Sequence, residues 1–183
     1  KLDSLILKNL FNNYNGFVEL ENHIIDLELN KKGFSIKGKG KFIIDKKSDK
    51  IDYNVSFNNG NYNFKSAIQL KKNPLKLEIL NYEKGEDDNS ILNIEGAYNK
   101  NKSTNFKNIL FEESKNKLLI KNLNLSNNFK IKDVRHLELD FINENKKFNK
   151  ITLKKNKTNY EINAKTFDGS TLLDKMLEND NKN

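Results

Sequence analysis

Residues 34–44 read FSIKGKGKFII and residues 51–57 read IDYNVSF, and both stretches alternate apolar side chains with Lys, Gly, Ser, Asp or Asn. Residues 62–70 and 75–79 repeat the same two-residue period. Because successive side chains of a β-strand point to opposite faces, this alternation predicts four strands that share one apolar and one polar face. An antiparallel sheet of this kind must cover its apolar face with something.

The alternation begins near Phe17 and continues through the second half of the chain, where turn residues recur about every ten positions. No segment between the strands is long enough for the helical crossover that parallel strands require. We therefore expect an all-β fold, a long twisted antiparallel meander over residues 17–169 that forms an open, taco-like β-groove. Gly38 and Gly40 interrupt the apolar face and predict a bulge or bend there.

Short helices are expected at both ends of this sheet. Apolar residues recur at three- and four-residue spacing in residues 1–16, which predicts a short amphipathic helix or linker, although the run Leu5-Ile6-Leu7 also allows a strand. Residues 170–183 predict a second short helix, capped by Ser170, that ends in a polar tail. The charged run at residues 82–90 is expected to be a solvated loop, because it lacks the ligand spacing of a calcium loop.

The charge of the chain argues against a nucleic-acid partner. Lys and Arg number 33 against 25 Asp and Glu, a formal charge of +8, yet Arg135 is the only arginine. Nucleic-acid sites cluster Arg with Lys and place aromatic residues beside them, whereas here Lys is spread along the chain and alternates with the aromatic residues. The positive balance is compatible with anionic lipid headgroups.

No catalytic apparatus is visible in the sequence. The chain has no cysteine, and its two histidines, His23 and His136, lie far apart without a supporting ligand pattern. Neither a nucleophile elbow nor a phosphate-binding glycine loop occurs. We therefore expect no enzyme activity, no metal and no cofactor. No apolar run approaches the ~18 residues of a membrane helix, so any membrane anchor is expected upstream of Lys1 in a longer parent chain.

Residues 119–126 (LIKNLNLS), 129–134 (FKIKDV) and 137–141 (LELDF) resemble the repeating β-segments of the AsmA-like superfamily, especially its YhdP/TamB-type members. Residues 80–96 and 160–173 are similar to the same family. The resemblance implies a fragment of a bacterial envelope protein that is anchored in the inner membrane and extends into the periplasm. It also implies that the apolar side of the sheet carries phospholipid acyl chains between the inner and outer membranes, with a role in outer-membrane biogenesis.

In this hypothesis the chain is a non-enzymatic, lipid-conducting segment, and other envelope proteins act at the two ends of the groove. The family supplies no ligand motif that transfers residue by residue, so the lining is assigned from alternation alone. The residues assigned to it are Phe34, Ile36, Phe42, Ile44, Tyr53, Val55, Phe57, Phe64, Ile68, Leu77, Ile79, Ile120, Leu139, Phe141 and Ile162.

A second hypothesis stays open at this point. The same alternation fits a closed β-sandwich or barrel, a structural or binding module of the cell envelope whose two halves pack face to face and leave no groove. A charged residue at Val55 or Phe64 distinguishes the two hypotheses. In an open groove it blocks lipid transport without unfolding the sheet, whereas in a closed sandwich or barrel it unfolds the core.

Overall fold

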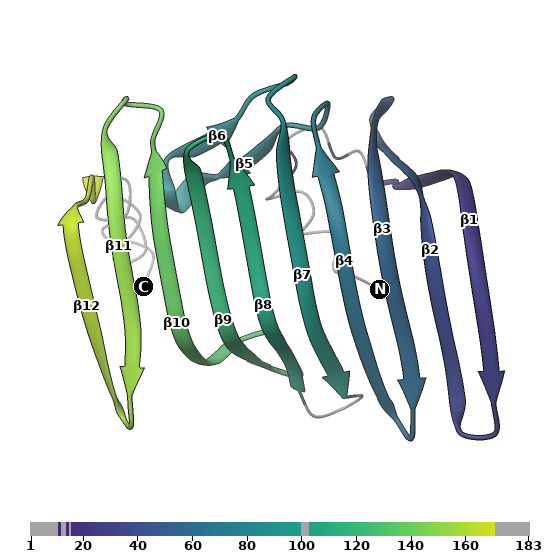
Figure 1. The fold of residues 1–183 in the computed structure, drawn as a ribbon. Coiled ribbons are helices and arrows are strands. Elements are labelled where there is room, and N and C mark those ends of the chain that lie inside the picture. The colour runs from purple at the N-terminus through teal and green to yellow at the C-terminus, as the bar shows by residue number, and fades with distance from the viewer. Residues whose placement is uncertain (1–10, 12–13, 15, 100–102, 171–183) are drawn as a thin grey trace.

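The computed structural model describes residues 11, 14, 16–99 and 103–170. They form one ten-stranded antiparallel sheet and a separate two-stranded sheet (Figure 1). The large sheet follows the order of the chain, except that β5 and β6 leave it between β4 and β7. The strands are β1 (Glu19–Asn30), β2 (Gly33–Ile44), β3 (Lys47–Asn58), β4 (Asn61–Leu70), β5 (Leu75–Leu77), β6 (Tyr82–Lys84), β7 (Ser90–Asn99), β8 (Ser103–Glu113), β9 (Asn116–Ser126), β10 (Ile131–Ile142), β11 (Phe148–Asn156) and β12 (Asn159–Thr166).

The predicted all-β antiparallel meander is confirmed. Among the described residues, strands β1 and β12 are the two edges and do not pair with each other, so the large sheet is not closed. The sheet is also not curled, so the taco-like shape expected from the sequence is not seen. Both halves of the chain lie in this one sheet, so the closed sandwich or barrel considered from the sequence is not the fold of the described residues. The terminal helices expected in residues 1–16 and 170–183 lie outside the described residues apart from a few positions. Among the described residues the helical element is the 3-10 turn η1 (Glu78–Leu80).

The register of the strands keeps the apolar residues on one face. Ile36 lies opposite Val55, Val55 lies opposite Phe64, and Phe64 lies opposite Gly96. Lysine, acidic and amide side chains occupy most of the alternate positions, as where Lys37 lies opposite Asn54, although Ile24 and Leu119 also lie on this side. We call these the apolar face and the polar face.

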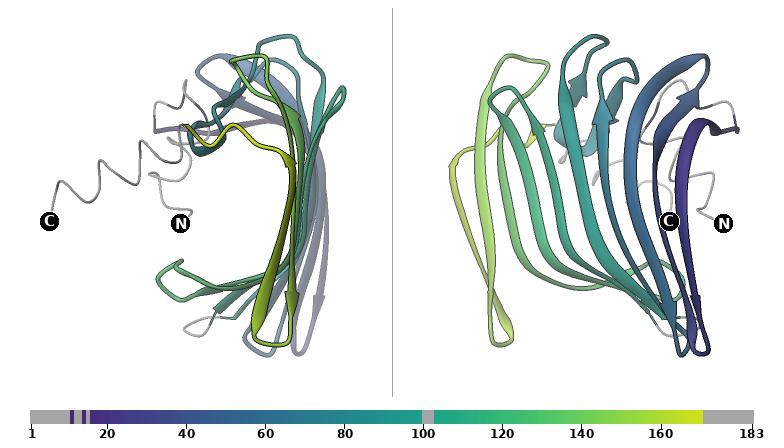
Figure 2. Two further views of the ribbon diagram at one scale, coloured as in Figure 1. Left: turned by 90° about the vertical axis from the view of Figure 1, so that its left-hand side faces the viewer. Right: turned by 45° about the vertical axis from the view of Figure 1, so that its right-hand side comes forward.

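Part of the apolar face is covered by the chain itself. Figure 2 shows β5 and β6 on the side toward which the strands bend, over one end of the sheet. Leu75 and Tyr82 of this excursion are 4% exposed, and they pack against buried side chains of the large sheet. That buried cluster comprises Phe11, Phe42, Ile44, Leu70, Leu75, Tyr82, Phe111, Leu139 and Phe141. We call residues 75–84 the cover.

Two expectations from the sequence were wrong in the cover. Residues 75–79 were expected to form the fourth strand of the large sheet, but Leu75–Leu77 pairs with Tyr82–Lys84 in a sheet of two strands, and η1 follows. Residues 82–90 were expected to be a solvated loop, and residues 85–89 do form a turn region that is largely exposed. Residues 82–84 instead form β6, in which Tyr82 is buried and Lys84 is fully buried. Three-residue strands carry too little alternation to show which sheet they join.

The glycines of β2 have a different role from the one expected. The register of β2 with β3 is continuous through Gly38 and Gly40, so β2 has no bulge there. The bulge lies in β1, where Asn22 has φ +53° and His23 projects over Gly40. A Cβ on Gly40 would lie 2.3 Å from the His23 ring, and a Cβ on Gly38 would lie 2.2 Å from the Tyr53 ring. These glycines therefore make room for rings from the neighbouring strands.

A row of irregular positions bends three neighbouring strands. Lys107 of β8 is left out of the register with β7, and Asn122 of β9 has φ +52°. The pairing of β9 with β10 also passes over Arg135 at this level. Because bulges increase the local twist and bend of a strand, this row accounts for the bend of β8, β9 and β10 toward the apolar face (Figure 2).

Candidate functional site

The apolar face has a second part that the cover does not bury. It consists of half-buried side chains that cross seven strands, and we call it the open strip. None of these residues belongs to the buried cluster, and none carries a charge. Its members are Phe34 and Ile36 of β2, Tyr53, Val55 and Phe57 of β3, Tyr62 and Phe64 of β4, Ile94 and Tyr98 of β7, Phe106 and Ile109 of β8, Ile120, Leu123 and Leu125 of β9, and Val134 of β10.

Eleven of the fifteen residues assigned from the sequence lie in the open strip or in the buried cluster, and four lie outside both sets. Seven lie in the open strip: Phe34, Ile36, Tyr53, Val55, Phe57, Phe64 and Ile120. Four lie in the buried cluster, where Phe42, Ile44, Leu139 and Phe141 are 2–6% exposed, and Ile68 packs against them. Ile162 lies on the edge strand β12 and is 64% exposed. Leu77 and Ile79 are not in the large sheet, because both lie in the cover, Leu77 in β5 and Ile79 in η1.

Aromatic rings form a continuous row at one end of the open strip. The ring centroids are 5.6 Å apart for Phe34 and Phe57, 4.7 Å for Phe57 and Tyr62, and 6.0 Å for Tyr62 and Tyr98. Tyr62 and Tyr98 were not among the assigned lining residues. The alternation of apolar and polar residues in the sequence could have identified them as members of the apolar face. In the structure, Tyr62 lies directly opposite Phe57 and Tyr98 lies directly opposite Tyr62. The row presents apolar ring surface together with two phenol hydroxyls.

A buried polar cluster holds the cover on the large sheet. The carboxylate of Asp49, at the start of β3, accepts hydrogen bonds from the backbone N–H groups of Lys71, Lys72 and Asn73 at 2.9–3.1 Å. The side-chain amide of Asn73 also donates to Asp49, at 3.0 Å. Asp49 is 6% exposed and Asn73 is fully buried. The chain that leaves β4 is therefore fixed to β3 before it crosses the apolar face.

Lys84 completes the attachment from β6. Its ammonium group donates to the carbonyl oxygens of Lys71 and Asn73, both at 3.1 Å, and to that of Gly85 at 2.5 Å. Burial lowers the pKa of Lys84, and the negative charge of Asp49 opposes that shift. Tyr82 donates its hydroxyl to Glu113 of β8, and burial is the main cause of its raised pKa. These groups hold the cover in place, and none of them belongs to the open strip.

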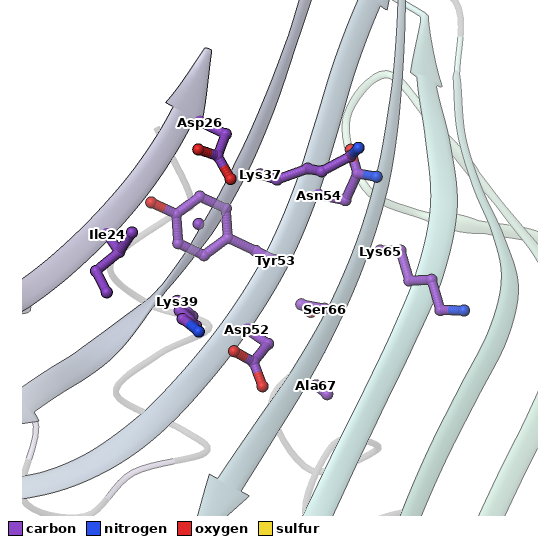
Figure 3. Close-up of a pocket in the computed structure, with 11 residues that line it drawn as sticks. Ile24, Asp26, Lys37, Lys39, Asp52, Tyr53, Asn54, Lys65, Ser66 and Ala67 are labelled. Atoms are coloured by element: carbon purple, nitrogen blue, oxygen red, sulfur yellow. The ribbon is translucent and has the colours of Figure 1, made fainter.

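The polar face offers a depression of about 410 Å³ over β1 to β4 (Figure 3). Charged side chains line it, including Asp26, Lys37, Lys39, Asp52 and Lys65. Opposite charges alternate here as on the rest of the polar face, where Lys107 pairs with Glu95 at 2.7 Å. No group of three metal-ligating side chains occurs among the described residues. The depression is therefore a charged part of the polar face, lined by three lysines and two aspartates.

The two histidines occupy separate places in the fold. His23 lies 2.9 Å from the carbonyl oxygen of Lys41 and 3.3 Å from the Tyr53 hydroxyl. His136 lies on the polar face of β10, 3.9 Å from Glu138. Each ring thus has a local structural partner.

Within the described residues, no helix has the length and apolar character to span a membrane. Comparison of the chain with protein-family models, with curated proteins and with solved structures finds no match. The open strip is therefore the feature from which a function can be argued.

Proposed function

We propose that this chain is a non-enzymatic segment of a β-groove that binds phospholipid acyl chains on its open strip. The observation that carries the proposal is a continuous, uncharged strip of apolar side chains that stays half-exposed beside a well-buried core. Apolar surface left in water costs about 25 cal/mol per Å², and contiguous exposed patches of this kind mark binding surfaces. An acyl chain is an apolar ligand that makes no demand on polar partners.

The dimensions of the strip fit such a ligand. Neighbouring strands are about 4.8 Å apart, so the seven strands that carry the strip span roughly 29 Å. An acyl chain extends through about half of the ~30 Å bilayer core, so one chain laid across the strands fits within the strip. The acyl chain would move along the open strip, from one strand to the next, by passive diffusion. The headgroup would stay in water at the rim, where lysines and amides lie.

The resemblance of residues 119–141 to AsmA-like repeats supports the same function. By that resemblance, the parent protein is anchored in the bacterial inner membrane and extends through the periplasm. The segment then contributes to phospholipid transport toward the outer membrane and to maintenance of the envelope. Partners at the groove ends would give the movement its direction.

The test is lipid retention by matched variants. The wild-type chain and its Val55→Asp variant would be purified from a bacterial envelope in mild detergent and examined by native mass spectrometry. We expect stoichiometric phospholipid on the wild type and at least a tenfold loss on Val55→Asp, because a carboxylate in the strip must be desolvated to bind an acyl chain. Circular dichroism and urea unfolding should show that the variant stays folded.

Two control variants separate lipid binding from folding. Ser56→Asp places the same charge one residue away, on the polar face, and should keep the lipid. Phe42→Asp places it in the buried cluster and should unfold the chain. If the wild type carries no lipid and binds no lipid analogue, the strip is part of a structural module without a conduit and the proposal fails.

A further inference from the structure

The acidic side chains of the edge strand β1 face lysines on one side only. On the polar face it presents four acidic side chains, Glu19, Glu21, Asp26 and Glu28, and no base. Its one neighbour, β2, presents Lys37, Lys39 and Lys41 on the same face. Glu21 forms an ion pair with Lys41 at 3.5 Å, whereas the structure gives no ion pair for the other three acids within its described residues.

In the interior strand β10, acidic side chains have lysine partners on both neighbouring strands. It also presents Glu138 and Asp140 on the polar face, and lysines from the strands on both of its sides pair with them. Glu138 pairs with Lys117 of β9 at 3.5 Å, and Asp140 pairs with Lys150 of β11 at 2.6 Å. An acidic strand in this sheet is thus flanked by two basic strands. Strand β1 has only one.

The other face of β1 points to the same conclusion. Leu20, Ile25, Leu27 and Leu29 lie on the apolar face, and they are 55–75% exposed. Edge strands that resist further pairing carry inward-pointing charges, proline or bulges. The bulge of β1 lies between Glu21 and Ile24, and the run from Ile24 to Asn30 contains no bulge, no proline and no charge on the apolar face. Within the part of the chain that the structure describes, no strand pairs with the outer edge of β1, so the outward backbone N–H and C=O groups there can accept another strand.

We propose that β1 is a docking edge for an extended segment that alternates lysine with apolar residues and adds to the sheet antiparallel to β1. Lysines of the incoming strand would pair with Glu19, Asp26 and Glu28, and its apolar residues would cover the exposed leucines of β1. A second copy of the chain fits this edge poorly. Two β1 strands would place acid against acid, and the other edge of the described sheet, β12, presents Glu161 and Asn163 on the polar face rather than a row of lysines.

The probe is a labelled peptide with the sequence of β11, FNKITLKKN, because this strand satisfies the acids of β10. Its binding to the whole chain would be followed by fluorescence anisotropy, and the site would be located by hydrogen exchange. We expect slower exchange of β1 amides in the bound state. The affinity should fall at least tenfold between about 0.05 M and about 0.5 M salt, because the pairing of exposed charges is screened. The same peptide with Glu in place of Lys should bind at least tenfold more weakly.

Variants on the two edge strands show which of them binds the peptide. The double variant Asp26→Lys, Glu28→Lys should lose the Lys peptide and gain the Glu peptide, and both positions are exposed, so the fold is expected to persist. Glu161→Lys on β12 should leave peptide binding unchanged. The proposal is overturned by protection of β12 instead of β1, by equal binding of both peptides, by no binding, or by self-association of the chain through β1. None of these outcomes depends on whether the open strip binds lipid.

Discussion

Gly96 shows how one missing side chain shapes the open strip. A Cβ at this position would lie 2.4 Å from the backbone oxygen of Asn105 and 2.7 Å from the Phe64 ring. The glycine therefore lets the Phe64 ring cross onto β7 and approach Phe106, with 5.7 Å between the ring centroids. We predict that Gly96→Ala lowers the free energy of unfolding by about 1–3 kcal/mol, because a backbone atom cannot move aside as a side chain can.

Urea unfolding checks this prediction, with Ala97→Ser as the control. Ala97 is the next residue and faces the opposite side of the sheet, where a hydroxyl should change stability by less than about 0.5 kcal/mol. Equal midpoints for Gly96→Ala and the wild type would show that β7 and β8 separate at no cost.

Lys84 carries the second prediction at the scale of single residues. Replacing it with Met keeps most of its length but leaves the carbonyl oxygens that it binds without their donor inside the protein. We expect Lys84→Met to lower the free energy of unfolding by about 2–4 kcal/mol and to speed hydrogen exchange in the cover. Lys76→Met, on β5, is the control and should change little. Unchanged exchange in the cover of Lys84→Met would mean that Asp49 alone holds it.

At the scale of elements, two hairpins end in similar ways. After β4, the backbone N–H groups of Lys71 to Asn73 donate to Asp49 at the start of β3. After β12, the backbone N–H of Asp168 donates to the Asn149 side chain of β11 at 2.7 Å. In both places a polar side chain near the start of the first strand binds the chain as it leaves the second strand. The hairpin β11–β12 is thereby fixed at the base by Asp168.

The Asp168 anchor predicts a specific dependence on pH. Hydrogen bonds from Ser170, Asn143 and Asn145 hold the pKa of Asp168 well below its ordinary value. A carboxylate of this kind stabilises the fold fully above the pKa of the unfolded chain, about 3.9, and the stabilisation is lost as the pH falls through the lower folded value. Stability of the wild type should therefore decline below about pH 4.

Comparison of Asp168→Asn with the wild type and with a control variant isolates the contribution of the Asp168 carboxylate to stability. Asp168→Asn should lower the urea midpoint at pH 7 and show a shallower decline from about pH 4 to about pH 2 than the wild type. Asp45→Asn, in an exposed turn, should follow the wild type. Parallel curves for Asp168→Asn and the wild type would contradict the assignment.

The sequence was informative about strands and weak about what lies over them. Long strands such as β2 and β3 contain five or six alternations, which was enough to predict which side chains share a face. Leu75–Leu77 and Tyr82–Lys84 are too short to carry that signal, and the burial of Lys84 depends on carbonyl groups from distant residues. For this reason Phe42, Phe141 and Phe34 looked alike in the sequence, although the cover buries the first two and leaves Phe34 in the open strip.

At the scale of the whole molecule, the sheet is stabilised unevenly. The buried cluster draws side chains from β2, β4, β8 and β10 and from the cover, so these strands are tied together through packing as well as through their ladders. Among the described residues, strands β1 and β12 each have one neighbouring strand and contribute no side chain to that cluster. Side chains on both edge strands remain more than half exposed, as Leu29 and Ile162 show. Stability should therefore decrease from the interior strands toward both edges.

Hydrogen exchange across the whole chain tests this gradient. We expect amides of β4 and β8 to exchange only through global unfolding, while paired amides of β1 and β12 exchange at least a hundredfold faster through local opening. Leu75→Asp should abolish the difference, because loss of the cover removes the packing that ties the interior strands together. A tenfold dilution of the protein serves as the control. If β1 exchanges as slowly as β4 at high concentration and quickly after dilution, the edge is paired between copies, and the acidic row of β1 does not prevent self-association.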